Sequence, residues 1–199
     1  FFSKQKTADG GPSGPVGWER CKRDRINDFG QTSNEKIYAA GDVTLGPQFV
    51  YVAAYEGGII TDNAIGGLNK KIDLSVVPAV TFTNPTVATV GLTEEQAREK
   101  YDVQIGKFNF AANGRAIASD AAQGFVKVIA DKKYGEILGV HIIGPAAAEL
   151  INEASSIIEM EITVEEMLKT IHGHPTYSEV MYEAFADVLG MAIHSPKKK

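Results

Sequence analysis

The sequence predicts an α+β fold, an antiparallel β-sheet with helices packed against it. Between residues 77 and 143, short apolar segments of strand length alternate with turns rich in proline, glycine and asparagine. From residue 146 to residue 160, apolar residues instead recur at the 3.6-residue period of an amphipathic helix. Strands that precede a group of helices, rather than alternating with them, are typical of an α+β layer.

The strands are predicted from their apolar patterns and from the turns that separate them. The first two flank a turn at Asn84-Pro85, and the last two flank residues 131–135, which read as a hairpin turn that ends in glycine. The expected strands are 77–82, 87–91, 103–110, 125–130 and 137–143.

The helices are predicted from capping signals and apolar spacing. Thr93 with Gln96, and Thr163 with Glu166, have the spacing of a capping box, in which the threonine and the later side chain each satisfy a backbone N–H at the helix start. These signals open short helices at 93–101 and from 163 onward, and the last helix is expected at 177–190.

The first 75 residues have a different character. A stretch rich in glycine and proline before residue 18 is typical of a loop or linker. A short apolar strand is expected at 36–40, ending at Gly41-Asp42, and a helix at 48–64. A glycine at a strand end permits close approach to the backbone, and the next carboxylate can accept hydrogen bonds from a hydroxylated ligand.

Composition limits the classes of function. The net charge is −5, and the only basic run is the terminal Lys197-Lys198-Lys199, so nucleic acid is not expected as a partner. No apolar segment is long enough to span a membrane, and no metal site is apparent. A single cysteine, Cys21, permits no internal disulfide and fits a reducing compartment. We therefore expect a cytoplasmic protein.

A candidate catalytic pair lies near the C-terminus, in the sequence 171–179. His174 precedes a proline, and Thr176 with Glu179 has capping-box spacing, so an imidazole on a stiff loop should lie beside a carboxylate at the start of a helix. A carboxylate that accepts one ring N–H fixes the tautomer and raises the basicity of the other nitrogen, as acid–base catalysis requires. Glu179 as a capping residue alone, with His174 as an ordinary loop residue, is the alternative interpretation.

Three segments resemble the pyridine nucleotide–disulfide oxidoreductases, a family that includes dihydrolipoamide dehydrogenase, glutathione reductase and mercuric reductase. The first is similar to the second FAD-binding motif of the family, the second to the opening of its dimerisation domain, and the third to its His-Pro-Thr-x-x-Glu signature. In order, they are Thr32 with Ala39-Ala40-Gly41-Asp42, Pro78 to Pro85 with Val90-Gly91, and His174-Pro175-Thr176-Tyr177-Ser178-Glu179.

The resemblance implies a role for each of these segments. Gly41 and Asp42 would contact FAD, with Asp42 on the ribityl chain, and the amides near Gln48 and Phe49 would face the flavin. His174 would exchange protons with a dithiol substrate and Glu179 would orient it. In the family this histidine serves the partner subunit's site, so a homodimer is implied. The divisions implied are 1–31 as an irregular segment, 32–75 as part of an FAD-binding domain, and 76–199 as the dimerisation domain.

Two segments of the sequence indicate different subfamilies. The histidine signature favours dihydrolipoamide dehydrogenase or another disulfide reductase, because mercuric reductases usually carry tyrosine there and end in a cysteine pair, and this sequence has neither feature. In contrast, residues 47–54 look more like the corresponding helix of mercuric reductases. His172 is interpreted as a structural loop residue and His141 as a half-buried strand residue, and His194 is given no role.

Several parts of a complete family member do not appear in this sequence. These are the Gly-x-Gly-x-x-Gly fold for FAD, the redox-active cysteine pair and the nicotinamide-binding fold. We therefore expect a C-terminal part of a longer enzyme that uses FAD and NAD(P), with a lipoamide-type substrate. Alone it should bind neither cofactor and transfer no electrons. A stand-alone dimerisation module, a chain completed by separate subunits, and a mercuric reductase-like parent are the alternatives.

Overall fold

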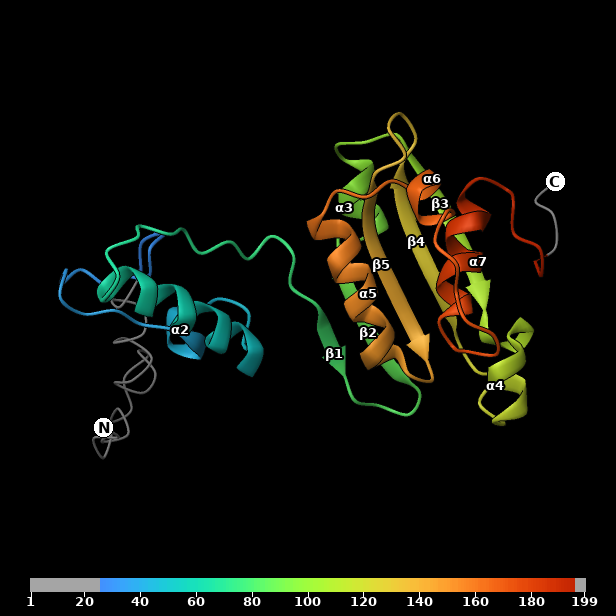
Figure 1. Cartoon of the computed structure of the whole chain (residues 1–199), viewed down its shortest axis with the longest axis horizontal. Helices are drawn as coiled ribbons and strands as arrows, with labels where there is room; N and C mark the ends of the chain where they lie inside the picture. The colour runs from blue at the N-terminus through green and yellow to red at the C-terminus, as the bar shows by residue number, and fades with distance from the viewer. Residues whose placement is uncertain (1–25, 196–199) are drawn as a thin grey trace, which may run out of the picture. The chain divides into compact units, whose positions relative to one another are not determined.

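The structure is a computed structural model that describes residues 26–195. The chain forms two compact units, divided between Leu74 and Ser75 (Figure 1). Cys21 and the expected linker before residue 18 lie outside the described residues. Within residues 26–195, every helix falls short of the length and apolarity that crossing a bilayer requires.

The second unit is built on a five-stranded sheet in which every neighbouring pair is antiparallel, as the sequence predicts. The strand order across the sheet is β1-β2-β5-β4-β3. The strands are β1 (Ala79–Thr81), β2 (Thr86–Gly91), β3 (Val103–Asn109), β4 (Phe125–Asp131) and β5 (Ile137–Gly144). The longest strand, β5, lies in the middle of the sheet beside β4, and Val128 of β4 pairs with Val140 of β5. Both of these valines are fully buried, so the hairpin forms the centre of the core.

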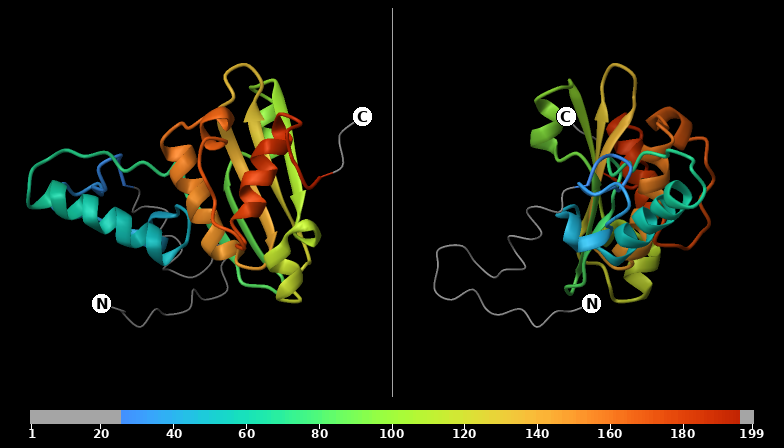
Figure 2. Two further views of the ribbon diagram at one scale, coloured as in Figure 1. Left: turned by 45° about the vertical axis from the view of Figure 1, so that its right-hand side comes forward. Right: turned by 90° about the vertical axis from the view of Figure 1, so that its left-hand side faces the viewer.

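Helices cover both faces of the sheet (Figure 2). On one face, α5 (Ala147–Glu159) packs against β2 and β5, and α7 (Glu179–Val188) packs against β3 and β4. The short α6 (Val164–Met167) joins the same core, which contains Phe108, Ile151 and Phe185. The opposite face carries α3 (Glu94–Arg98), whose Ala97 packs with Ile129 and Leu138 in a smaller cluster. Strand side chains alternate between the two faces, so one strand supplies both clusters.

The predicted capping boxes at Thr93 and Thr163 are both present, with Gln96 and Glu166 as the reciprocal partners. In contrast, no element was predicted between β3 and β4, where η2 (Phe110–Ala112) and α4 (Gly114–Ala118) form. Asn113 caps α4, because its side-chain oxygen accepts a hydrogen bond from the Ala116 amide at 2.9 Å. Its amide group also donates to the Thr176 carbonyl at 3.1 Å, which ties α4 to the loop before α7.

The position of α7 is fixed by close contact with β3. Nearly every residue from Val180 to Val188 is buried. Gly106 of β3 leaves room for the helix backbone, because a Cβ there would overlap the Ala184 carbonyl oxygen. Beside it, the Lys107 amide donates to a carboxylate oxygen of Asp187 at 2.8 Å. These contacts hold the second half of α7 against β3, and so fix the course of the helix that begins at Glu179.

In the first unit, η1 (Gly41–Thr44) precedes α2 (Val50–Ala64), close to the expected helix. The strand expected at 36–40 is wrong: Tyr38 forms only an isolated bridge with Gln31, because no neighbouring strand in residues 26–74 completes a ladder. If the rest of an FAD-binding domain is missing, part of the apolar face formed by Ile37, Tyr38, Val52 and Tyr55 is expected to lie uncovered. Tyr55 is exposed, but Val52 is buried within the unit.

Candidate active site

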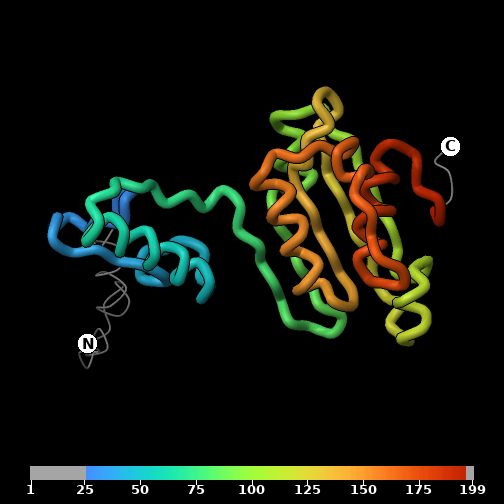
Figure 3. Tube along the Cα trace, viewed as in Figure 1, coloured from blue at the N-terminus to red at the C-terminus, as the bar shows by residue number. Residues whose placement is uncertain are grey.

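The candidate site lies on the loop between α6 and α7. The chain leaves α6, runs back past α7, and then turns into that helix at Glu179 (Figure 3). His174 lies on this turn, and 76% of its side chain is exposed. The loop is anchored at Thr176, whose carbonyl accepts the hydrogen bond from Asn113.

His174 and Glu179 are brought together as the sequence spacing predicts. His174 Nδ1 lies 2.8 Å from Glu179 Oε1. An ionised carboxylate can only accept a hydrogen bond, so Nδ1 is the donor in this contact. In the neutral ring the remaining nitrogen, Nε2, then carries the lone pair, and this nitrogen makes no hydrogen bond to any of residues 26–195. The geometry thus presents a basic nitrogen to solvent with its tautomer fixed.

The charge on Glu179 is favoured by its surroundings. Partial burial raises the pKa of this carboxyl group, but the Thr176 amide and the His174 ring donate hydrogen bonds to it, and their combined effect lowers the pKa below 4.5. The Thr176 amide donates to Oε2 at 2.8 Å. The two oxygens of the carboxylate therefore have different partners, the loop backbone and the imidazole.

The predicted capping box at Thr176 is only half correct. Glu179 does accept the Thr176 amide, but the Thr176 hydroxyl donates to the Gly173 carbonyl at 2.7 Å instead of capping the helix. Ser178 is the residue that precedes α7, and its side chain makes no capping hydrogen bond. The Thr176 hydroxyl therefore stabilises the turn around Pro175, rather than the start of the helix.

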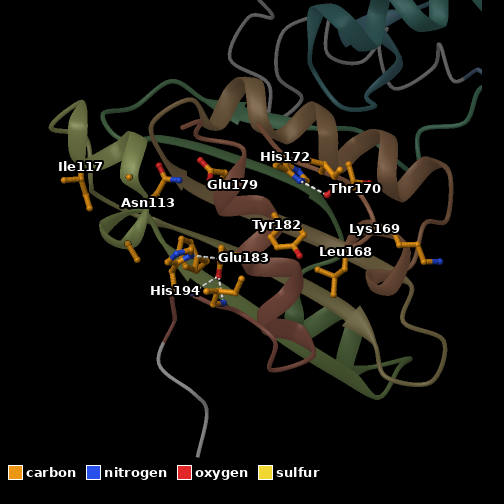
Figure 4. Close-up of a pocket in the computed structure, with 15 residues that line it drawn as sticks. Asn113, Ile117, Leu168, Lys169, Thr170, His172, Glu179, Tyr182, Glu183 and His194 are labelled. Carbon is orange, nitrogen blue, oxygen red and sulfur yellow. Dashed lines mark hydrogen bonds and ion pairs between the residues drawn. The ribbon is translucent and has the colours of Figure 1, made fainter. Parts of the chain in front are cut away.

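A cavity of about 570 Å³ opens beside the loop, between α4, α7 and the segment after α7 (Figure 4). Its polar lining includes Glu179, Tyr182 and Glu183 from α7, together with His172 and His194. Apolar side chains complete the wall. These are Phe108, Ile117, Leu168, Ile171 and Ile193.

His194, given no role from the sequence, binds a buried carboxylate. Glu183 accepts hydrogen bonds from the Ile193 amide at 2.9 Å, from the His194 amide at 3.2 Å, and from His194 Nδ1 at 2.8 Å. The spacing of Glu179 and Glu183 puts both carboxylates on one side of α7, which is the signal that could have indicated this cluster. His141 is half-buried as predicted, with Nε2 3.0 Å from the Leu92 carbonyl, and burial lowers its pKa.

The residues expected to contact FAD lie in the first unit. Gly41 has a φ of +78° and packs directly on α2, where a Cβ would lie 3.0 Å from that of Ala53. The Gly41 amide donates to the buried carboxylate of Glu56. Asp42, next in the chain, is exposed, and its carboxylate has no hydrogen-bond partner among the described residues. An open acceptor beside a close-packed glycine suits a ligand that carries hydroxyl groups.

Gln48 and Phe49 immediately precede α2. Phe49 is the residue before the first helical turn, and its ring stacks on that of Tyr51 with centroids 5.0 Å apart. Gln48 is exposed. The N–H groups at the start of such a helix suit an electron-rich ligand group. Among residues 26–195, no group of three or more histidine, cysteine, aspartate or glutamate side chains could hold a metal ion.

Residues 77–185 match the pyridine nucleotide-disulphide oxidoreductase dimerisation domain. The chain belongs to this family. The match covers the sheet, α5 and most of α7, and so includes the loop with His174 and Glu179.

Relatives with two different names are similar to this chain. A mercuric reductase of Lysinibacillus sphaericus is 64% identical over 155 residues, which cover 77% of this chain and 28% of that protein. A dihydrolipoyl dehydrogenase of Bacillus subtilis is 42% identical over 171 residues, which cover 85% of this chain and 37% of that protein. The chain therefore spans about a third of the length of these two relatives.

Two solved structures share the fold. The HOCl-induced flavoprotein disulfide reductase RclA from Escherichia coli matches with a TM-score of 0.76 and 30% identity, over 83% of this chain and 39% of that one. LpdA from Mycobacterium tuberculosis matches with the same TM-score and identity, over 81% of this chain and 36% of that one.

Proposed function

We propose that this chain is the C-terminal part of an FAD-dependent, NAD(P)H-linked disulfide oxidoreductase, and that His174 and Glu179 are its acid–base pair. The observation that carries the proposal is the 2.8 Å contact between these two side chains on an exposed loop. The contact leaves His174 Nε2 open to a substrate, and membership of the dimerisation-domain family supports the class of enzyme.

The chemistry proposed for this pair is proton transfer in thiol–disulfide exchange. A thiolate, rather than a thiol, attacks a disulfide, so a base that removes the thiol proton raises the reactive fraction. His174 Nε2 would accept that proton and return it to the leaving sulfur. Glu179 would stabilise the protonated ring through Nδ1. FAD, when bound, would accept the electron pair that the dithiol gives up.

The remaining parts of the site are proposed from the first unit and from a second subunit. Gly41, Asp42, Gln48 and Phe49 would hold part of the flavin, and the dimerisation domain would form a homodimer in which His174 serves the partner's site. The redox-active cysteines and both nucleotide-binding folds would come from another part of the same protein. Alone, the chain is proposed to be inactive.

Two substrates are compatible with this proposal. A lipoamide-type dithiol is our first choice, because such a substrate needs the acid–base residue that His174 provides. Mercuric ion is the second, and is favoured by the 64% identity to a mercuric reductase, against 42% to a dihydrolipoyl dehydrogenase. The alternative to an enzyme is a stand-alone dimerisation module that has no catalytic activity.

The proposal can be tested by transplanting the aligned segment of this chain into the Bacillus subtilis dihydrolipoyl dehydrogenase and into the Lysinibacillus sphaericus mercuric reductase. Turnover of dihydrolipoamide and of mercuric ion is then measured for both chimeras. We expect the first chimera to oxidise dihydrolipoamide, and His174→Gln to reduce its kcat by roughly 10²- to 10⁴-fold, the usual contribution of general acid–base catalysis. His141→Gln, away from the loop on β5, is the control.

The possible outcomes separate the alternatives. Full activity with His174→Gln would refute the proposed role of the pair. Turnover of mercuric ion alone would favour the second substrate. Chimeras that fold and dimerise but turn over neither substrate would favour the non-catalytic module.

A further inference from the structure

We propose that His172 is a positioning residue for His174, and that its doubly protonated ring fastens the loop that carries His174 to α5. The proposal rests on the function proposed above for His174. From the sequence alone, His172 is interpreted only as a structural loop residue.

His172 is mostly buried, although its neighbours on both sides, residues 169–171 and 173–175, are exposed. Only 8% of its side chain is exposed, whereas the preceding residue, Ile171, is 96% exposed. The next histidine, His174, is also mostly exposed. A polar ring is stable in a buried position only if its nitrogens find hydrogen-bond partners.

Both ring nitrogens of His172 face acceptors. Nε2 lies 2.9 Å from Oε1 of Glu153 on α5, and Nδ1 lies 3.4 Å from the Thr170 carbonyl oxygen (Figure 4 draws the second contact). A carboxylate and a carbonyl oxygen can only accept hydrogen bonds. Both nitrogens can donate at once only in the doubly protonated ring. The geometry thus favours the imidazolium form.

The surroundings of His172 favour the same charge. The Glu153 hydrogen bond raises the pKa of His172, and burial opposes it. The pKa is raised further by the negative charges of Glu153 and Glu179 and by the hydrogen bond to the Thr170 carbonyl. The net result is a pKa above 6.5. From α7, the Tyr182 ring packs against His172 with centroids 5.6 Å apart.

The attachment of His172 to α5 limits the positions that His174 can adopt. Only Gly173 lies between the two histidines, so a ring fixed to α5 restricts where the next imidazole can lie. The loop is then held from two helices, by Glu153 of α5 through His172 and by Glu179 of α7 through His174. Because the pKa of His172 is raised on folding, this contribution is complete below about pH 6.5 and is lost as the pH rises through the folded-state pKa.

The inference is tested by NMR on the whole 199-residue chain, without flavin or substrate. The ring nitrogens of His172 are titrated, and amide hydrogen exchange is measured at residues 171–177. Glu153→Gln removes the carboxylate but keeps its shape. Glu149→Gln, one turn earlier on α5 and exposed, is the matched control.

We expect wild-type His172 to titrate above pH 6.5. Over the same pH range, exchange of the loop amides should accelerate by more than the intrinsic rise of amide exchange with pH. Glu153→Gln should lower that midpoint and speed exchange at residues 173–176 roughly tenfold near neutral pH, the usual scale for loss of a hydrogen bond to a charged group. Glu149→Gln should do neither. The proposal is overturned if His172 titrates below 6.5 in the wild-type chain, or if the two variants behave alike.

A second readout links the loop to catalysis. In the dihydrolipoyl dehydrogenase chimera, Glu153→Gln should lower kcat and shift the alkaline limb of its pH profile, while Glu149→Gln leaves the profile unchanged. An unshifted profile would overturn the link between His172 and His174. Failure of the proposed function would look different, because the chimera carrying the unaltered segment would then show no dependence on His174 at all.

Discussion

The position of α7, and with it that of Glu179, should depend on the absence of a side chain at Gly106. In Gly106→Ala the new Cβ would overlap the Ala184 carbonyl oxygen and would lie 2.6 Å from Val188 Cγ2 and 2.8 Å from the Val188 amide nitrogen. Overpacking a core commonly costs about 1–3 kcal/mol. The upper end is expected here, because two of the three atoms belong to the helix backbone and cannot rotate away.

A loss of about 3 kcal/mol reduces the folding equilibrium constant of the second unit roughly a hundredfold and lowers its melting temperature by roughly 10 °C. The measurement is urea unfolding followed by circular dichroism. Gly114→Ala is the matched control, because a Cβ at the first residue of α4 would meet no atom within 4 Å. It should change stability by no more than about 1 kcal/mol.

The result can also contradict this account of α7. If Gly106→Ala and Gly114→Ala unfold at the same urea concentration, α7 does not pack against β3 as closely as described. A destabilised Gly106→Ala whose Lys107 amide keeps its exchange protection would also count against it, since displacement of the helix should break the hydrogen bond from that amide to Asp187.

Three further predictions concern the second unit. Phe185→Ala should cost about 3–5 kcal/mol in urea unfolding, because the ring is fully buried between α7 and the sheet; a cost below 1 kcal/mol would contradict its place in the core. The pKa of Glu179 is lowered on folding, so its carboxylate stabilises the unit above about pH 4.5 and loses that effect as the pH falls through the folded-state pKa. The difference in unfolding free energy between wild type and Glu179→Gln should therefore shrink between pH 6 and pH 3. A difference that stays constant over this range would contradict the lowered pKa. Glu94→Gln should cost at most about 1 kcal/mol, and less in high salt, because the contacts of Glu94 with Lys127 and Arg98 are partly exposed; a salt-independent loss would be unexpected.

Much of the fold of the second unit could be predicted because its signals are local. Strand patterns, the Asn84-Pro85 turn and the boxes at Thr93 and Thr163 depend on residues a few positions apart, and each appears in the structure. The short α4 escaped prediction because five residues are too few to show a helical period. The strand expected at 36–40 failed because a strand requires a partner, which its own sequence cannot supply.

In the candidate site, contacts between residues close in sequence could be predicted, whereas contacts between distant residues could not. His174 and Glu179 are five residues apart, and their spacing was enough to predict their contact. The partner of His172 is Glu153, nineteen residues earlier on another helix. Glu183 meets His194 only because the chain returns to α7 after its end. Such pairs depend on how α5, α7 and the following segment pack together, and no local pattern encodes that arrangement.

The most direct test of the acid–base role is to measure the two half-reactions of the dihydrolipoyl dehydrogenase chimera separately, by rapid mixing with dihydrolipoamide or with NADH. If His174 accepts and returns the proton of the dithiol, His174→Gln should slow the dithiol half-reaction by roughly 10²- to 10⁴-fold and leave the nicotinamide half-reaction unchanged. Equal slowing of both half-reactions, or of neither, would contradict the role proposed for His174.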